Sequence, residues 1–192
     1  MDEFIAHNRT EWRNWLAENH QTSKGVWLIN YKKASNKPYL SYAEGVEEAL
    51  CFGWIDSIKR TVDAERSKQY YSPRKPKSNW SKLNKERVEK LTAAGQIMEA
   101  GQKMIDLAKK TGTWTALDGV SNLEIPEDLQ ATLTLYENAE HHFSAFPASV
   151  KKGILEWILN AKTPETRMKR LVETASVAAE NKRANQYVKK SV

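Results

Sequence analysis

Residues 54–74, WIDSIKRTVDAERSKQYYSPR, decide how the first half of the chain folds. The segment Trp54–Thr61 continues an apolar run that is too short and too aromatic for a helix of its own, so we interpret it as a buried strand. Residues 67–74 are the expected partner strand, because the connection VDAER has the length of a hairpin loop and Asp63 is a typical turn residue. The sequence therefore predicts two neighbouring antiparallel strands.

Helices and a further strand are expected before this hairpin. Asn8 can cap a first helix, since its side chain can accept from the free amide groups of the first turn. Residues 25–33, GVWLINYKK, are rich in β-branched and aromatic residues and predict a strand. Ser41 and Glu44 have the capping-box spacing at the start of a second helix.

Two prolines end the hairpin on its downstream side. Neither Pro73 nor Pro76 can donate a backbone hydrogen bond, so both favour an extended, exposed connection. A helical pattern begins at Ser81, and it places Leu83 and Val88 on one predicted core side. The first half of the chain thus combines strands with helices.

The predicted fold class is α+β, with a small antiparallel sheet packed with helices over residues 1–114. Residues 115–125 show no clear period and are the expected linker. An all-helical region is expected over residues 126–182, followed by a frayed tail over residues 183–192. The last helix of that region opens at Thr163 and Pro164, and its predicted core face is Met168, Leu171, Val172 and Ala175.

The composition indicates a globular protein that folds without help. Of its 192 residues, 40% are hydrophobic and 28% are charged, well away from the composition of disordered chains. No apolar run approaches the roughly 20 residues that span a bilayer, and the start MDEFIAHNRTEW resembles no signal peptide. We therefore expect a cytoplasmic protein that does not insert into a membrane. The single cysteine, Cys51, fits a reducing compartment.

Motifs for common enzyme chemistry are missing from the sequence. Cys51 lies in the apolar run ALCFGWI and is expected to be a core residue, and one cysteine cannot form a multi-thiolate metal site. The neighbours His141 and His142 do not have the spacing of metal ligands. Neither a glycine-rich phosphate loop nor an acyl-transfer serine motif occurs. We expect no catalytic residue, no metal and no cofactor.

Positive charge is concentrated in residues 59–90. This segment carries eleven Lys or Arg against four Asp or Glu, a balance of +7, whereas the whole chain carries +6, so the rest of the chain sums to −1. Aromatic residues lie among these charges, and cations with stacking rings are typical of sites for nucleic acid or another polyanion. We therefore expect an anionic partner, either a nucleic acid or an acidic protein. The alternative is that Trp80 packs against the next helix and the charges form a solvated rim.

A second hypothesis starts from Asp56, a carboxylate in an otherwise apolar stretch, which must face solvent or find a partner. Arg74 or Arg87 would be its natural counter-ion. If Asp56, Arg74, Trp80 and Arg87 converge, they would form a cleft of several hundred cubic ångströms for a small molecule, as a binding site or as the site of an enzyme.

Several long runs resemble the YdeI/OmpD-associated family of bacterial proteins, also called bacteriocin-protection proteins. The runs are GVWLINYKK, LSYAEGVEEALCFGWIDS, YYSPRKPKSNWSKLNKERVEKL and WILNAKTPETRMKRL. The resemblance implies a YjbR/CyaY-like α+β domain followed by a helical region, and a role in envelope stress or bacteriocin protection with no agreed reaction. The family's strongest motif positions fall on Trp54, Asp56, Pro73, Arg74, Ser78, Trp80, Asn84, Arg87, Glu165, Thr166 and Arg167.

Charge, aromatic content and this resemblance together define one set of candidate ligand-binding residues. The set is Trp54, Asp56, Tyr71, Arg74, Lys75, Ser78, Trp80, Asn84 and Arg87.

Overall fold

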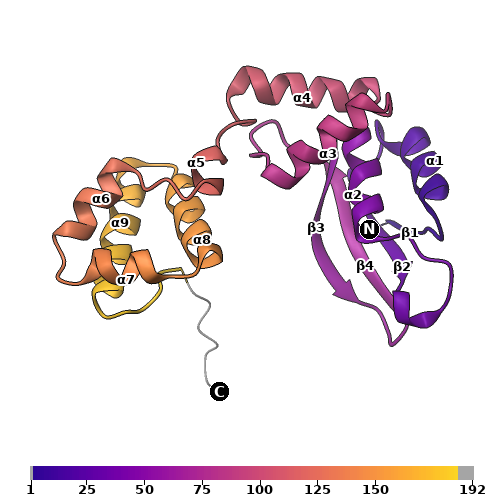
Figure 1. The fold of residues 1–192 in the computed structure, drawn as a ribbon. Coiled ribbons are helices and arrows are strands. Elements are labelled where there is room, and N and C mark those ends of the chain that lie inside the picture. The colour runs from indigo at the N-terminus through magenta and orange to yellow at the C-terminus, as the bar shows by residue number, and fades with distance from the viewer. Residues whose placement is uncertain (1, 186–192) are drawn as a thin grey trace. The chain divides into compact units, whose positions relative to one another are not determined.

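The computed structural model of the chain describes residues 2–185, which form two compact units (Figure 1). The boundary between the units falls between Ala116 and Leu117. The first unit contains strands and helices, and the elements described in the second are all helices, which confirms the predicted α+β fold class. Within residues 2–185, no helix combines the length and the apolar character needed to cross a membrane.

The first unit contains four strands and four α-helices in the described part of the chain. Its elements are β1 (Asp2–Ile5), α1 (Arg9–Asn19), β2 (Val26–Tyr31), the short 3-10 helix η1 (Lys33–Ser35), α2 (Tyr42–Cys51), β3 (Trp54–Thr61), β4 (Arg66–Pro73), α3 (Lys82–Ala93) and α4 (Glu99–Thr111).

Local capping signals in the sequence are confirmed. The Asn8 side chain accepts a hydrogen bond from the Glu11 amide at 3.0 Å, at the start of α1. At the start of α2, Ser41 and Glu44 form the reciprocal capping box. These contacts lie within four residues of each other in sequence, which explains why spacing alone predicts them.

The strands form one sheet in the order β1-β2-β4-β3. The pairs β2–β4 and β3–β4 are antiparallel as expected, but β1 pairs parallel to β2, so the sheet is mixed. Strand β1 was not predicted from the sequence. Its four residues DEFI have no distinctive pattern, and a parallel pair depends on contacts distant in sequence.

The predicted hairpin is confirmed, but most of β3 is exposed instead of buried. Only Trp54 of this strand is buried, because β3 lies at the edge of the sheet. A β-bulge interrupts its pairing: Asp56 lies opposite Tyr71 and Lys59 opposite Gln69, so two residues of β3 face one of β4. The bulge keeps Asp56 and Lys59 on the same side of the sheet, although their spacing alone would place them on opposite sides.

The two faces of the sheet have different surroundings. Helices α1 to α4 all contribute to one hydrophobic core, and the strand residues Val26, Leu28 and Tyr71 belong to it. Trp27 and Ile29 alternate with these residues along β2 and are also buried, but they lie outside that core. The sheet therefore has a covered face, which packs on the helices, and an opposite face, which we call the open face.

The second unit is a set of short helices around its own core. They are α5 (Asp118–Ser121), α6 (Glu127–Thr134), α7 (Ala139–Ala145), α8 (Ala148–Leu159) and α9 (Pro164–Ala179). As expected, Thr163 caps the last of them, accepting from the Thr166 amide at 3.2 Å. The main core side chains are Leu129, Leu133, Phe143, Ile154, Leu155, Ile158 and Leu171.

The predicted core faces of two helices, α3 and α9, are wrong in part. Leu171 and Ala175 of α9 are buried as expected, whereas Met168 is 57% exposed and Val172 40% exposed. The buried face of α9 also includes Thr174 and Ala178. Apart from Leu171, this face therefore consists of small residues, and Met168 and Val172 lie to one side of it. Leu83 of α3, also expected in the core, is 54% exposed.

The segments expected to be irregular have more structure than the sequence indicated. Residues 115–125, predicted as a linker, contain α5, and Val120, Leu123 and Ile125 pack against the second core. In the predicted tail, Ala184 is buried in the same core. The remainder of that tail, residues 186–192, lies outside the described residues.

Candidate functional site

The candidate residues Arg74 and Trp80 form a buried stack at the end of β4. The Arg74 guanidinium lies 3.8 Å from the centroid of the Trp80 ring, and the two side chains are 5% and 1% exposed. One terminal nitrogen of Arg74 donates to the Asn79 carbonyl at 2.5 Å, whereas its Nε and Nη1 atoms are buried without a hydrogen-bond partner. Burial lowers the pKa of Arg74 to about 10, so the group stays charged at neutral pH. In this arrangement neither ring nor guanidinium is available to a macromolecular partner.

Asp56, in β3, accepts its hydrogen bonds from neutral groups. Its Oδ2 atom accepts from the Tyr42 hydroxyl at 2.8 Å and from the Gln69 amide at 3.3 Å. Of its expected counter-ions, Arg74 feels the Asp56 charge, which offsets part of the fall in the pKa of Arg74 that burial causes. Burial raises the pKa of Tyr42, and its hydrogen bond to Asp56 raises that pKa further.

Arg87 approaches the same group of residues from α3. It donates to the Asn84 side chain at 2.9 Å, and its guanidinium lies 6.0 Å from the centroid of the Tyr42 ring. The charges of Asp56 and Arg87 both act on Tyr71: burial and the Asp56 charge raise the pKa of Tyr71, whereas Arg87 lowers it. Of the four residues of the second hypothesis, Arg74 and Trp80 contact each other directly, and Asp56 and Arg87 both contact Tyr42.

The remaining candidates divide by exposure. Trp54 is buried and donates its indole N–H to the His20 carbonyl at 3.2 Å. Ser78 is half-buried, and its amide donates to the Lys75 carbonyl in a turn. Lys75 is exposed. Of the nine candidates, only Lys75 is therefore fully at the surface.

A cavity of about 420 Å³ opens on the covered face of the sheet, between β2, β4, the segment after β2 and the start of α2. Tyr42, Gln69 and Tyr71 line it and connect it to Asp56. Further lining comes from Lys32, Lys33, Tyr39 and Lys59, and no Asp or Glu lies among the lining residues. None of Asp56, Arg74, Trp80 and Arg87, which the second hypothesis expected to form a cleft, is among the residues that line this cavity.

Sequence reasoning missed most of the residues that line this cavity. Residues 31–42, YKKASNKPYLSY, contain three lysines and three tyrosines, a pattern similar to that of the basic segment. These residues precede Lys59 and therefore lie outside the basic segment, residues 59–90. The segment after β2 and Lys59 of β3 are distant in sequence. They line the same cavity because β2 and β3 both pair with β4 in the sheet.

The open face carries a second group of cations and rings. The charged ends of Arg60 and Lys68 lie 5.2 Å and 5.1 Å from the centroid of the Trp27 ring. The Tyr70 ring lies 5.3 Å from the same ring. Lys68 also pairs with Glu3 at 2.6 Å. Of these four cation and ring residues, Arg60, Lys68 and Tyr70 belong to the basic segment defined from the sequence.

Cys51 has the environment of a core residue. It is fully buried, and burial raises the pKa of its thiol to about 11, so little reactive thiolate forms at neutral pH. Within residues 2–185, no group of three or more His, Cys, Asp or Glu is arranged to hold a metal ion.

Comparison with known proteins assigns the two halves of the chain to different families. Residues 4–104 match a domain of unknown function, DUF8412, and because they make up more than half of the chain, the chain belongs to this family. Residues 122–181 match the family described as bacteriocin-protection, YdeI or OmpD-associated, which confirms that resemblance for the helical half. The expected YjbR/CyaY-like domain is not supported, since the first half matches DUF8412 instead. Neither curated proteins nor solved structures provided a significant match.

Proposed function

We propose that this chain is a binding protein and that the open face of its first unit binds single-stranded nucleic acid. The observation that carries this proposal is that Arg60 and Lys68 lie over one ring, Trp27, on the face of the sheet opposite the helices. The bacteriocin-protection family matched by the second half supports a protective role in the cell. A cytoplasmic location would give such a protein access to nucleic acid.

Charge on the open face favours an anionic partner. Arg60 and Lys68 lie opposite each other in the β3–β4 register, so two positive groups are adjacent. Glu3 pairs with Lys68 at 2.6 Å and neutralises part of its charge. Contact with the Trp27 ring restricts both cations, which lowers the entropy that they would lose on binding a phosphate.

The aromatic side chains favour nucleic acid over an acidic protein. Tyr70 is half-buried and lies two residues from Lys68 along β4, so the two side chains share the open face about 7 Å apart. A base can stack on the Tyr70 ring while a phosphate contacts Lys68 or Arg60. An acidic protein offers charge but no flat bases for this ring.

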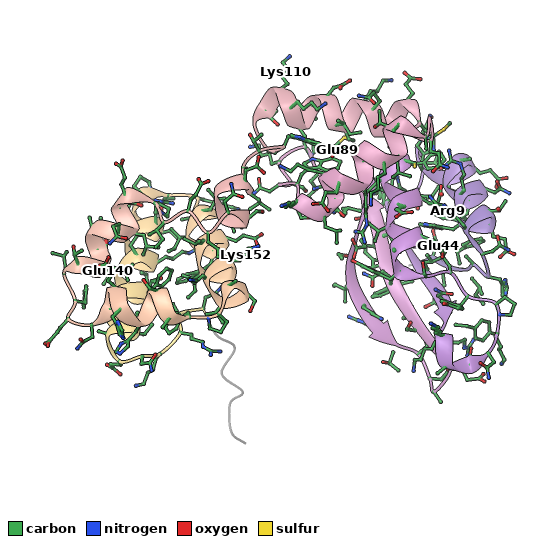
Figure 2. The ribbon with its side chains drawn as sticks, in the orientation of Figure 1. Arg9, Glu44, Glu89, Lys110, Glu140 and Lys152 are labelled. Carbon is green, nitrogen blue, oxygen red and sulfur yellow. The ribbon has the colours of Figure 1, made fainter. Side chains whose placement is uncertain are left out.

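The test is the binding of a dye-labelled single-stranded DNA 12-mer of mixed sequence, followed by fluorescence anisotropy. With two or three phosphates neutralised, the affinity should fall with salt at a log–log slope of about −1.4 to −2. The double variant Arg60→Gln, Lys68→Gln should bind at least about tenfold more weakly and with a shallower slope. Lys110→Gln is the matched control, because Figure 2 shows this exposed lysine pointing away from the unit on α4.

Two results would reject the proposal. In one, the double variant binds the DNA as tightly as the wild-type protein. In the other, polyglutamate of similar charge binds as tightly as the DNA, which would indicate an acidic protein partner instead.

A further inference from the structure

We propose that the cavity on the covered face is a separate binding site for a small phosphate monoester with a flat organic group. Its volume of about 420 Å³ lies within the range of small-molecule pockets. Most strand residues that line it, including Leu28, Gln69 and Tyr71, lie on the covered face, whereas Trp27, Lys68 and Tyr70 lie on the open face, so the two sites are on opposite sides of the sheet.

The charge of the cavity determines the chemical class of the ligand. Lys32, Lys33 and Lys59 line it without any carboxylate. Lys32 is already engaged, donating to the carbonyls of Asp63 at 2.7 Å and Ala64 at 3.0 Å. Lys33 and Lys59 are exposed, and the described part of the chain provides neither of them with an ion pair. Two free ammonium groups match a dianionic phosphate better than a monoanionic carboxylate.

The remaining lining favours a flat organic group on that phosphate. Tyr39 and Tyr42 are 38% and 54% exposed at the rim, so their rings offer flat apolar surface. Leu28 and Leu40, both almost fully buried, close the bottom of the cavity. The hydroxyl groups of Ser41 and Ser67 add hydrogen-bonding capacity beside these rings.

Contacts around the cavity hold its walls in place. Asn30 makes reciprocal hydrogen bonds with the backbone of Leu40, accepting from its amide at 2.9 Å and donating to its carbonyl, and so fastens the segment after β2 to the sheet. On the other side, Gly45 allows the Tyr71 hydroxyl to pack against α2, since a Cβ atom there would lie 2.6 Å from that oxygen. The cavity is therefore preorganised, which reduces the entropic cost of binding.

The experiment is a ¹H–¹⁵N NMR titration of the full chain with phenyl phosphate, inorganic phosphate and benzoate. Phenyl phosphate should give saturable shifts at the amides of Ser41, Gly45 and Gln69, and it should bind more tightly than either of the two other probes. Lys59→Gln should weaken this binding at least about fivefold, because it removes one charged contact. Ser67→Phe should abolish binding by filling the cavity without a change of charge.

Control variants separate this site from the open face. Lys110→Gln and the double variant Arg60→Gln, Lys68→Gln should bind phenyl phosphate like the wild-type protein. Lys59 is an exposed strand residue, so Lys59→Gln remains informative if Ser67→Phe does not fold.

Three results would overturn the site. The shifts could grow linearly without saturation, they could be centred on other surface lysines, or benzoate could bind as tightly as phenyl phosphate. Unchanged binding by Lys59→Gln would overturn it as well. None of these results depends on whether the open face binds DNA.

Discussion

Arg74 and Trp80 form a cation–π pair inside the first unit, with the guanidinium 3.8 Å from the ring centroid. The pair joins the end of β4 to the connection before α3, and the Trp80 amide donates to the Thr113 carbonyl at 3.2 Å, so it also joins α4 to the sheet. The centroid of the Trp114 ring lies 5.0 Å from that of the Trp80 ring. These two residues of the basic and aromatic segment thus connect the sheet to the segments that flank α3 and α4.

Two substitutions at Arg74 should distinguish what its packing contributes to stability from what its charge contributes. Arg74→Ala should lower the free energy of unfolding of the first unit by about 2 to 3 kcal/mol, because the contact of the side chain with Trp80 is lost. Arg74→Met keeps most of that contact and removes a buried charge with two unpaired nitrogens, so its effect should be within about 1 kcal/mol of zero. Hydrogen exchange measured by mass spectrometry reports the unfolding of each unit separately. Equal losses in both variants would show that the charge itself stabilises the fold.

Neighbouring glutamates of α2 should differ strongly in their contribution to stability. Glu48 is 1% exposed; its carboxylate pairs with Arg13 at 2.6 Å and also with Arg9, which is labelled in Figure 2. Glu48→Gln should destabilise the first unit by about 2 to 3 kcal/mol, since it leaves two arginines without this partner. Glu47 is the matched control: it pairs with Arg9 at 2.9 Å and is partly exposed, so Glu47→Gln should cost less than about 1 kcal/mol. Urea denaturation measures both values, and similar losses would contradict this assignment.

Local signals in the sequence predicted the hairpin and the helix caps correctly, because the groups involved are close in the chain. Sequence could not show which face of the sheet a residue occupies, since the bulge after Asp56 changes the alternation of β3. It also could not show that Arg74 is buried, because isolated charged residues are seldom buried and nothing local marks the exception. The cavity depends on β2 and β3 lying on either side of β4, a contact pattern between segments distant in sequence.

The ion pair between α6 and α9 should give the second unit a pH-dependent contribution to stability. Arg167 contacts both carboxylate oxygens of Asp128, at 2.6 Å and 2.9 Å, and this hydrogen bonding lowers the pKa of Asp128. A carboxyl group whose pKa is lowered on folding stabilises the fold above its unfolded pKa of about 4, and this stabilisation is lost as the pH falls through the lower folded value. Since Asp128 is partly exposed, Asp128→Asn should cost no more than about 1 kcal/mol at pH 7, and less in high salt.

The measurement for this pair is the difference in stability between the wild-type protein and Asp128→Asn as a function of pH. The difference should shrink as the pH is lowered below about 4. A difference that stays constant down to pH 2 would show that the substitution acts through packing and not through the charge.

Two helical glycines provide a last comparison, because an added Cβ atom would meet very different surroundings at the two positions. A Cβ atom on Gly101 of α4 would lie 2.3 Å from the Cys51 carbonyl oxygen, a backbone atom at the end of α2 that cannot move aside alone. Gly101→Ala should therefore force α4 away from α2 and destabilise the first unit by about 2 kcal/mol or more. A Cβ atom on Gly153 of α8 meets no atom within 4 Å, so Gly153→Ala should stabilise the second unit by about 0.5 to 1 kcal/mol through its higher helix propensity. Hydrogen exchange in each unit measures both effects, and a stabilising Gly101→Ala would show that α4 does not pack on α2 this closely.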